Sequence, residues 1–186
     1  MSAVTSPFGF RPAFHTTGNA RGTPYQIASG YATSIFKNQP VILNTNGTIT
    51  AGTPAADLLG VFAGVEYVDA NGRPQASDFW TAGTVATQVR AYVYDEPNTV
   101  YEVQADGPVL QTAVGDQADV TNVTVGSTSN GLSGATLSSA LVGAAIQGQF
   151  RIVGFSQALD NAVGDAFTVV QVRIARHQYV AAKVAI

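Results

Sequence analysis

The sequence is poor in charge and has no cysteine, and each shortage excludes a class of function. Of its 186 residues 9 are basic and 12 acidic, so its charged share of 11% is below the roughly 25% usual in soluble domains. A net charge of −3 provides no basic footprint, and we expect no nucleic-acid partner. Without cysteine there are no disulfides or thiolate metal ligands, which fits a reducing cytoplasm.

Catalytic and cofactor motifs are missing too. The two histidines, His15 and His177, have no acid or nucleophile near them in sequence, and we interpret both as packing or surface imidazoles. No G-x-S-x-G, P-loop, G-x-G-x-x-G or H-E-x-x-H pattern occurs. Asp95 and Glu96 are acids of a turn, where acids are common. We therefore expect a protein that is not an enzyme, with no catalytic residues, no cofactor and no metal.

Long apolar runs and basic clusters are equally scarce. The most apolar window, residues 137–146, is too short to span a bilayer, and residues 1–7 lack the pattern of a signal peptide. We expect no membrane partner. Arg173, Arg176 and Lys183 are too sparse for a phosphate-binding stripe.

Short apolar runs that stop at turn residues are abundant, above all between Ser34 and Val109. Turns recur every eight to twelve residues and no strong amphipathic helix is visible. This pattern predicts an all-β fold, with a barrel-like or sandwich-like core of short antiparallel strands and an extended N-terminal arm. A second small β lobe is a further expectation.

The clearest pair of runs lies on either side of a Pro-Asn turn within Val89–Ala105 and predicts a hairpin. In that hairpin Tyr92 lies opposite Tyr101 and Val93 opposite Val100. Both faces are largely apolar, which predicts a strand pair covered on both sides. We expect these four residues to form the core, although the tyrosines could instead form a stacking platform for sugars or bases.

Changes in composition along the chain predict three segments: an extended N-terminal arm over residues 1–24, a barrel-like core over 25–110, and a second β segment or lobe, packed on the core, over 111–186. Within the last segment, residues 121–134 are rich in Thr, Ser, Gly and Asn and predict a long, solvent-exposed loop.

The arm carries three apolar anchors, Phe8, Phe10 and Phe14, and two basic residues, Arg11 and Arg21, without an acid. One interpretation is a terminus whose phenylalanines fold back onto their own domain. The other is a segment that becomes ordered on a neighbouring subunit by strand addition or by inserting its phenylalanines. On the second interpretation these five residues form an interface.

Ser34–Thr50 contains a Pro-Val turn and an Asn-Gly turn, and the L-G-V-F-A-G-V run of Leu59–Val65 follows it. This order of turns and strands resembles the capsid decoration proteins of tailed bacteriophages. Gly115-Asp116 and the polar run Gly126–Gly134 also resemble phage head-protein sequence. The chain is longer than the small decoration proteins, so a second lobe or a long insertion is needed.

The resemblance implies a cement subunit on the outer surface of the virion, made in the host cytoplasm. Such a subunit binds the major capsid protein, stabilises the shell by bridging capsomers, and forms a homo-oligomer, more often a trimer than a dimer. Two alternatives remain open: a head-fibre or tail-tip component that binds host glycan, and a carbohydrate-binding β module.

Overall fold

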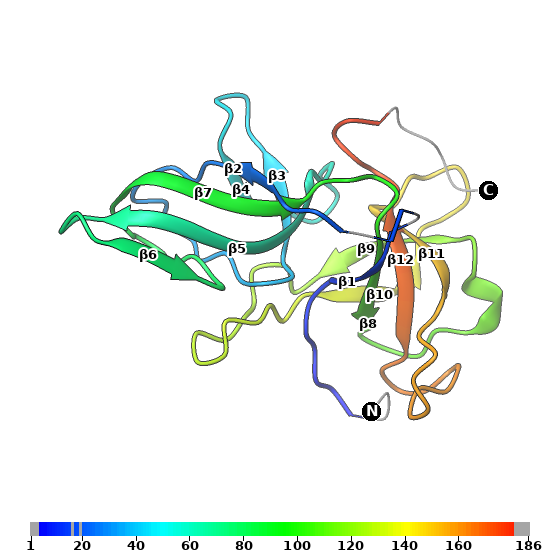
Figure 1. The fold of residues 1–186 in the computed structure, drawn as a ribbon. Helices are drawn as coiled ribbons and strands as arrows, with labels where there is room; N and C mark the ends of the chain where they lie inside the picture. Colours follow the sequence, from blue (N-terminus) through cyan, green and yellow to red (C-terminus); the bar gives the residue numbers. More distant parts are fainter. Residues whose placement is uncertain (1–3, 16, 19, 181–186) are drawn as a thin grey trace.

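The structure, a computed structural model, describes residues 4–15, 17–18 and 20–180 and confirms the all-β prediction. Its strands form two antiparallel sheets packed together in a sandwich-like fold (Figure 1). The first, called the barrel sheet, has the order β1–β8–β12–β11–β9–β10, and the second, called the open sheet, has the order β2–β7–β5–β3–β4 with β6 beside β5. No helix in the described part of the chain is long and apolar enough to cross a membrane.

The strands are short except for two. Those of the barrel sheet are β1 (Arg11–Phe14), β8 (Val100–Gln104), β9 (Gln117–Thr121), β10 (Thr136–Leu141), β11 (Phe150–Phe155) and β12 (Val169–Ile174), and a 3₁₀ turn, η1 (Gln111–Ala113), follows β8. Those of the open sheet are β2 (Thr23–Tyr25), β3 (Pro40–Leu43), β4 (Ile49–Ala51), β5 (Gly60–Asp69), β6 (Pro74–Ser77) and β7 (Ala86–Tyr94). The long strands β5 and β7 pair antiparallel and form the spine of the open sheet.

The barrel sheet closes on itself. Four antiparallel pairings lead from β8 to β10, so these two strands run in the same direction. A parallel bridge between Ala105 and Leu137 joins them, and the Asp106 N–H donates to the Leu137 carbonyl at 2.9 Å. Closure removes free strand edges and encloses a core. That core is built from residues of β8 to β12, with Tyr101, Val103, Val120, Leu137, Phe150, Ile152, Val170 and Val172 among its members.

The open sheet has a separate core under its inner face. Val89, Ala91 and Val93 project there from β7, and Phe62 and Val65 from β5. Loops cover this core. Residues Ile35 and Trp80, both fully buried, come from two such loops and exchange both backbone hydrogen bonds, at 2.8 and 3.0 Å.

The predicted hairpin within Val89–Ala105 is wrong. Strand β7 lies in the open sheet between β2 and β5, and β8 lies in the barrel sheet between β1 and β12. Each strand already has two partners, so the chain between them crosses from one sheet to the other. Tyr92 pairs with Gly64 and Tyr101 with Val172 and Pro12. The chain therefore passes from the open sheet to the barrel sheet between residues 94 and 100.

Burial also differs from the prediction at one of the four core residues. Val93, Val100 and Tyr101 are fully buried, whereas Tyr92 is half-buried on the outer face of β7. The physical reason is the twofold alternation of a strand: Val93 faces the core of the open sheet, so its neighbour Tyr92 faces away.

Candidate functional site

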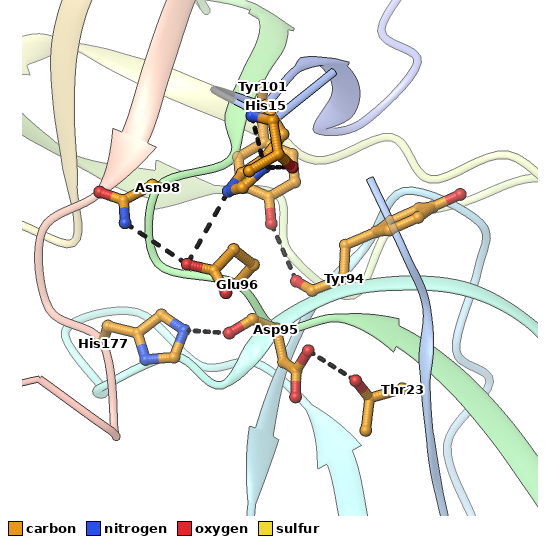
Figure 2. A network of polar contacts seen from close by, with 9 residues as sticks. His15, Thr23, Tyr94, Asp95, Glu96, Asn98, Tyr101 and His177 are labelled. Atoms are coloured by element: carbon orange, nitrogen blue, oxygen red, sulfur yellow. Dashed lines mark hydrogen bonds and ion pairs between the residues drawn. The ribbon is translucent and has the colours of Figure 1, made fainter. Parts of the chain in front are cut away.

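Polar side chains from three parts of the chain meet at the crossover between β7 and β8, residues 95–99 (Figure 2). We call this crossover and its polar contacts the junction. Asp95 begins it, and its carboxylate accepts hydrogen bonds from the Thr23 hydroxyl at 2.8 Å and from the Tyr25 hydroxyl at 2.7 Å. Both donors belong to β2, so an N-terminal strand is fastened to the crossover. Burial raises the pKa of Tyr25, with bonds to Tyr179 and Asp95 acting in the same direction.

His177 reaches the same crossover from the other end of the chain. Its Nε2 lies 3.0 Å from the Asp95 carbonyl, and its Nδ1 accepts the Tyr179 N–H at 3.1 Å. The acceptor role of Nδ1 requires the neutral tautomer with the proton on Nε2. Burial lowers the pKa of His177 below its ordinary value, in agreement with a neutral ring.

His15 approaches from the N-terminal segment. Its Nε2 lies 3.8 Å from a Glu96 carboxylate oxygen, which also accepts the Asn98 amide at 3.4 Å. Its Nδ1 lies 2.7 Å from the Thr17 hydroxyl. Beneath this pair the buried Tyr101 hydroxyl donates to the Tyr94 carbonyl at 2.9 Å, and burial raises the pKa of Tyr101.

Two imidazoles and two carboxylates thus meet at one connection, which sequence reasoning missed. The sequence contains no local signal for this meeting, because residues 15, 95 and 177 are far apart along the chain and come together only in the folded structure. The side-chain polar atoms of Asp95 and His177 all have partners within the protein, so this arrangement suits holding the segments together. Among the described residues no group of three or more His, Cys, Asp or Glu side chains could hold a metal ion.

Further bonds join the two sheets beside this junction. Leu58 forms a parallel bridge with His177, and Arg176 pairs with Asp57 at 2.8 Å. The Gln178 side chain both accepts the Leu43 N–H at 2.8 Å and donates to the Leu43 carbonyl at 2.9 Å. The segment after β12 is therefore bound to the open-sheet half at residues 176–178.

The polar loop of residues 121–134, expected in solvent, docks on the open-sheet side of the molecule (Figure 1). The Lys37 N–H donates to the Gly131 carbonyl at 2.9 Å, and the Ser133 N–H donates to the Lys37 carbonyl at 3.0 Å. A Cβ on Gly126 would overlap the Phe36 ring, so glycine is required for this approach. Residues 122, 124–125 and 128–130 of the loop stay exposed.

The predicted arm is extended, and it lies on both of its own sheets. Strand β1 pairs with β8 and β2 pairs with β7, so this segment connects the two sheets as the crossover does. We call the segment from β1 to β2, with the preceding Phe10, the N-terminal strap. Phe10 is fully buried and stacks on Phe150 with ring centroids 4.2 Å apart. The expectation that Phe10 is an interface anchor is therefore wrong, because a ring fully buried in its own barrel has no surface to offer a neighbour.

The other predicted arm residues remain nearer the surface. Arg11 is exposed, donates to Glu102 at 2.7 Å and lies over the Phe8 ring, with its Cζ 5.0 Å from the centroid. Burial alone would raise the pKa of Glu102, but hydrogen bonds from Arg11, Ser156 and Gln171 lower it. Phe14 is 50% exposed and Arg21 is exposed. The structure thus brings Phe8 and Arg11 together but not Arg21.

A shallow groove of about 660 Å³ crosses the outer face of the open sheet. Tyr92 and Tyr94 line it from β7, Gly64 and Glu66 from β5, and Asp78 from the segment after β6. The Tyr92 hydroxyl donates to Glu66 at 3.0 Å, and this bond raises the pKa of Tyr92. We call this feature the tyrosine groove. Tyr101, which the stacking-platform interpretation included, is buried in the barrel instead.

Several exposed apolar side chains lie on segments of the barrel half next to β11. The Gly164 N–H donates to the Val109 carbonyl at 3.0 Å and the Gly115 N–H to the Ile152 carbonyl at 2.9 Å, so η1, β11 and the loop after β11 adjoin. We call the patch on these segments the barrel patch; its exposed apolar side chains are Leu110, Val114, Val153, Leu159 and Val163.

Comparisons of the chain with protein-family models, with curated protein sequences and with solved structures give no match. The junction, the tyrosine groove and the barrel patch therefore carry the functional argument by themselves.

Proposed function

We propose that the chain is a structural virion protein that decorates a tailed-phage capsid, binds its major capsid protein and stabilises the shell by bridging neighbouring capsomers. The observation that carries this proposal is the fastened junction. The chain crosses between the sheets twice, from β1 to β2 and from β7 to β8, and loop 121–134 and the segment after β12 add hydrogen bonds to the open-sheet half. These bonds support a stiff body made of both halves. A bridge between two capsomers needs such stiffness, because a hinged connector would let them separate.

The barrel patch supplies a surface for the contact. Five exposed apolar side chains lie on adjoining segments, and exposed apolar patches are typical of protein interfaces. The low charge of the chain also suits a tight contact, since few charged groups lose water on binding. A shell repeats each contact many times, so modest affinity at one patch becomes high avidity.

Capsid binding tests this function directly. Shells of the major capsid protein from the same genome are mixed with the purified chain, and co-sedimentation and electron microscopy measure the copies bound. We expect regular decoration at many copies per shell. Leu110→Ser combined with Val163→Ser should abolish it, whereas Val85→Ser, equally exposed but on the open-sheet half, should not. Shells that remain bare with the unaltered protein would refute the proposal.

The tyrosine groove favours a second candidate function, glycan binding by a head-fibre or tail-tip component or by a carbohydrate-binding module. Two tyrosine rings beside carboxylates suit the apolar faces and hydroxyl groups of a sugar. On a glycan array, Tyr92→Ala should weaken binding about tenfold, equal to ~1.4 kcal/mol, and Tyr179→Ala should leave it unchanged. An array without any bound glycan would leave capsid decoration as the sole proposal.

A further inference from the structure

Three donor side chains form a row across the outer face of the barrel. In the register of the sheet Arg151 on β11 lies opposite Gln117 on β9 and opposite Arg173 on β12. Their neighbours Ala118, Ile152 and Val172 face the barrel core, so the row faces outward. Two arginines directly opposite each other repel, and such pairs destabilise a sheet.

No ion pair in the described chain engages the two arginines of this row. The ion pairs formed there by basic groups involve Arg11, His15, Lys37 and Arg176, and neither Arg151 nor Arg173. Arg173 Nε is buried without a hydrogen-bond partner. Gln117 is fully buried; its Oε1 accepts the Gly148 N–H at 2.9 Å, and its Nε2 has no partner. Buried donors without an acceptor are costly and call for an explanation.

These donors line a hollow of about 240 Å³ between the barrel and the crossover. Pro97 and Asn98 of the crossover form one wall, and Val180 contributes to another. The hollow is large enough for a small ion and its water. Its lining includes Arg151, Arg173 and Gln117, and the Gln117 oxygen is already engaged, so this side chain can offer only its Nε2 donor.

We propose that this hollow, the arginine pocket, binds a small oxyanion: a free phosphate or a carboxylate presented by another molecule. The oxygens would accept from Arg173 Nε, the Arg151 guanidinium and Gln117 Nε2. An anion there cancels the repulsion between the arginines and satisfies both buried donors, and guanidinium groups match the geometry of either oxyanion. The sequence around Arg173 contains no cluster of basic residues. Arg151 becomes its neighbour only because β11 pairs with β12 in this register.

Thermal unfolding and calorimetric titration of the full chain test the site. The protein is titrated at pH 7 and constant ionic strength with phosphate, with acetate, and with chloride as the control. We expect phosphate or acetate to raise the melting temperature saturably, and chloride to have no such effect. Phosphate acting alone assigns the site to a free ion, and acetate acting alone assigns it to a carboxylate of a partner.

Two variants and a matched control make the result specific. Arg151→Gln and Arg173→Gln should each weaken oxyanion binding at least about tenfold, while Arg90→Gln, an exposed arginine of β7, should not. In chloride alone Arg151→Gln should melt at or above the temperature of the unaltered protein, because it removes the repulsion. If Arg173→Gln does not fold, Arg151→Gln decides. No saturable effect of either oxyanion, or an equal effect in the variants, would overturn the proposal.

Discussion

The two halves of the molecule cover their cores in different ways. The barrel sheet closes through the bridge between Ala105 and Leu137, so its own strands enclose its core. The open sheet does not close, and loops that carry Ile35 and Trp80 cover its inner face. A closed barrel needs only alternation within strands, whereas an open sheet depends on distant loops. Its uncovered outer face is accordingly where the tyrosine groove lies.

The two faces of β7 provide the largest expected effect. Val93→Asp places an unpaired charge in the core of the open sheet and should lower the free energy of unfolding by at least about 3–5 kcal/mol. Tyr92→Asp, one residue away on the outer face, should cost about 1 kcal/mol. Chemical denaturation measures both. Equal losses would mean that the outer face is covered as well.

Phe10 tests how firmly the N-terminal strap belongs to the barrel. Phe10→Ala removes a fully buried ring stacked on Phe150 and should cost about 3–5 kcal/mol, because it leaves a cavity. Phe14→Ala, four residues further along at the end of β1 and half exposed, should cost under about 1 kcal/mol. Urea unfolding compares the two variants. A negligible effect of Phe10→Ala would show that the strap is detached from the barrel in solution.

Asp95 tests whether the halves unfold as one unit. Asp95→Ala removes the acceptor of the Thr23 and Tyr25 hydroxyls and should cost about 1–3 kcal/mol. Glu96→Gln, at the exposed neighbour, should change stability by no more than about 0.5 kcal/mol. In scanning calorimetry we expect one transition for the unaltered protein. Two separate transitions in it would contradict the stiff body on which bridging depends.

His177 provides the smallest effect, and it depends on pH. Its folded-state pKa is lowered by burial, so the unfolded chain binds the proton more tightly. This contribution is complete above the unfolded pKa of about 6.5 and is lost as pH falls from there through the folded pKa. His177→Gln should flatten the stability profile between pH 7.5 and 5.5. An unchanged slope in that variant would assign the dependence to another group.

Local patterns predicted the all-β class, because twofold alternation and turn residues act over a few neighbours. The same patterns placed Val93, Val100 and Tyr101 on apolar faces, and all three are buried. They misplaced the pairing of β7 with β8, because a Pro-Asn turn does not specify which sheet the next strand joins. Hydrogen bonds to β2, β5, β1 and β12 decide that, and these strands are distant in the chain.

The sequence alone determined that this protein is made of short strands with little charge, since composition and periodicity are local properties. Only the tertiary structure decided that the N-terminal segment straps both sheets, that His15 and His177 meet at one crossover, and that Arg151 lies beside Arg173. The physical reason is register: each of these neighbours is fixed by strand pairing and packing between residues far apart along the chain.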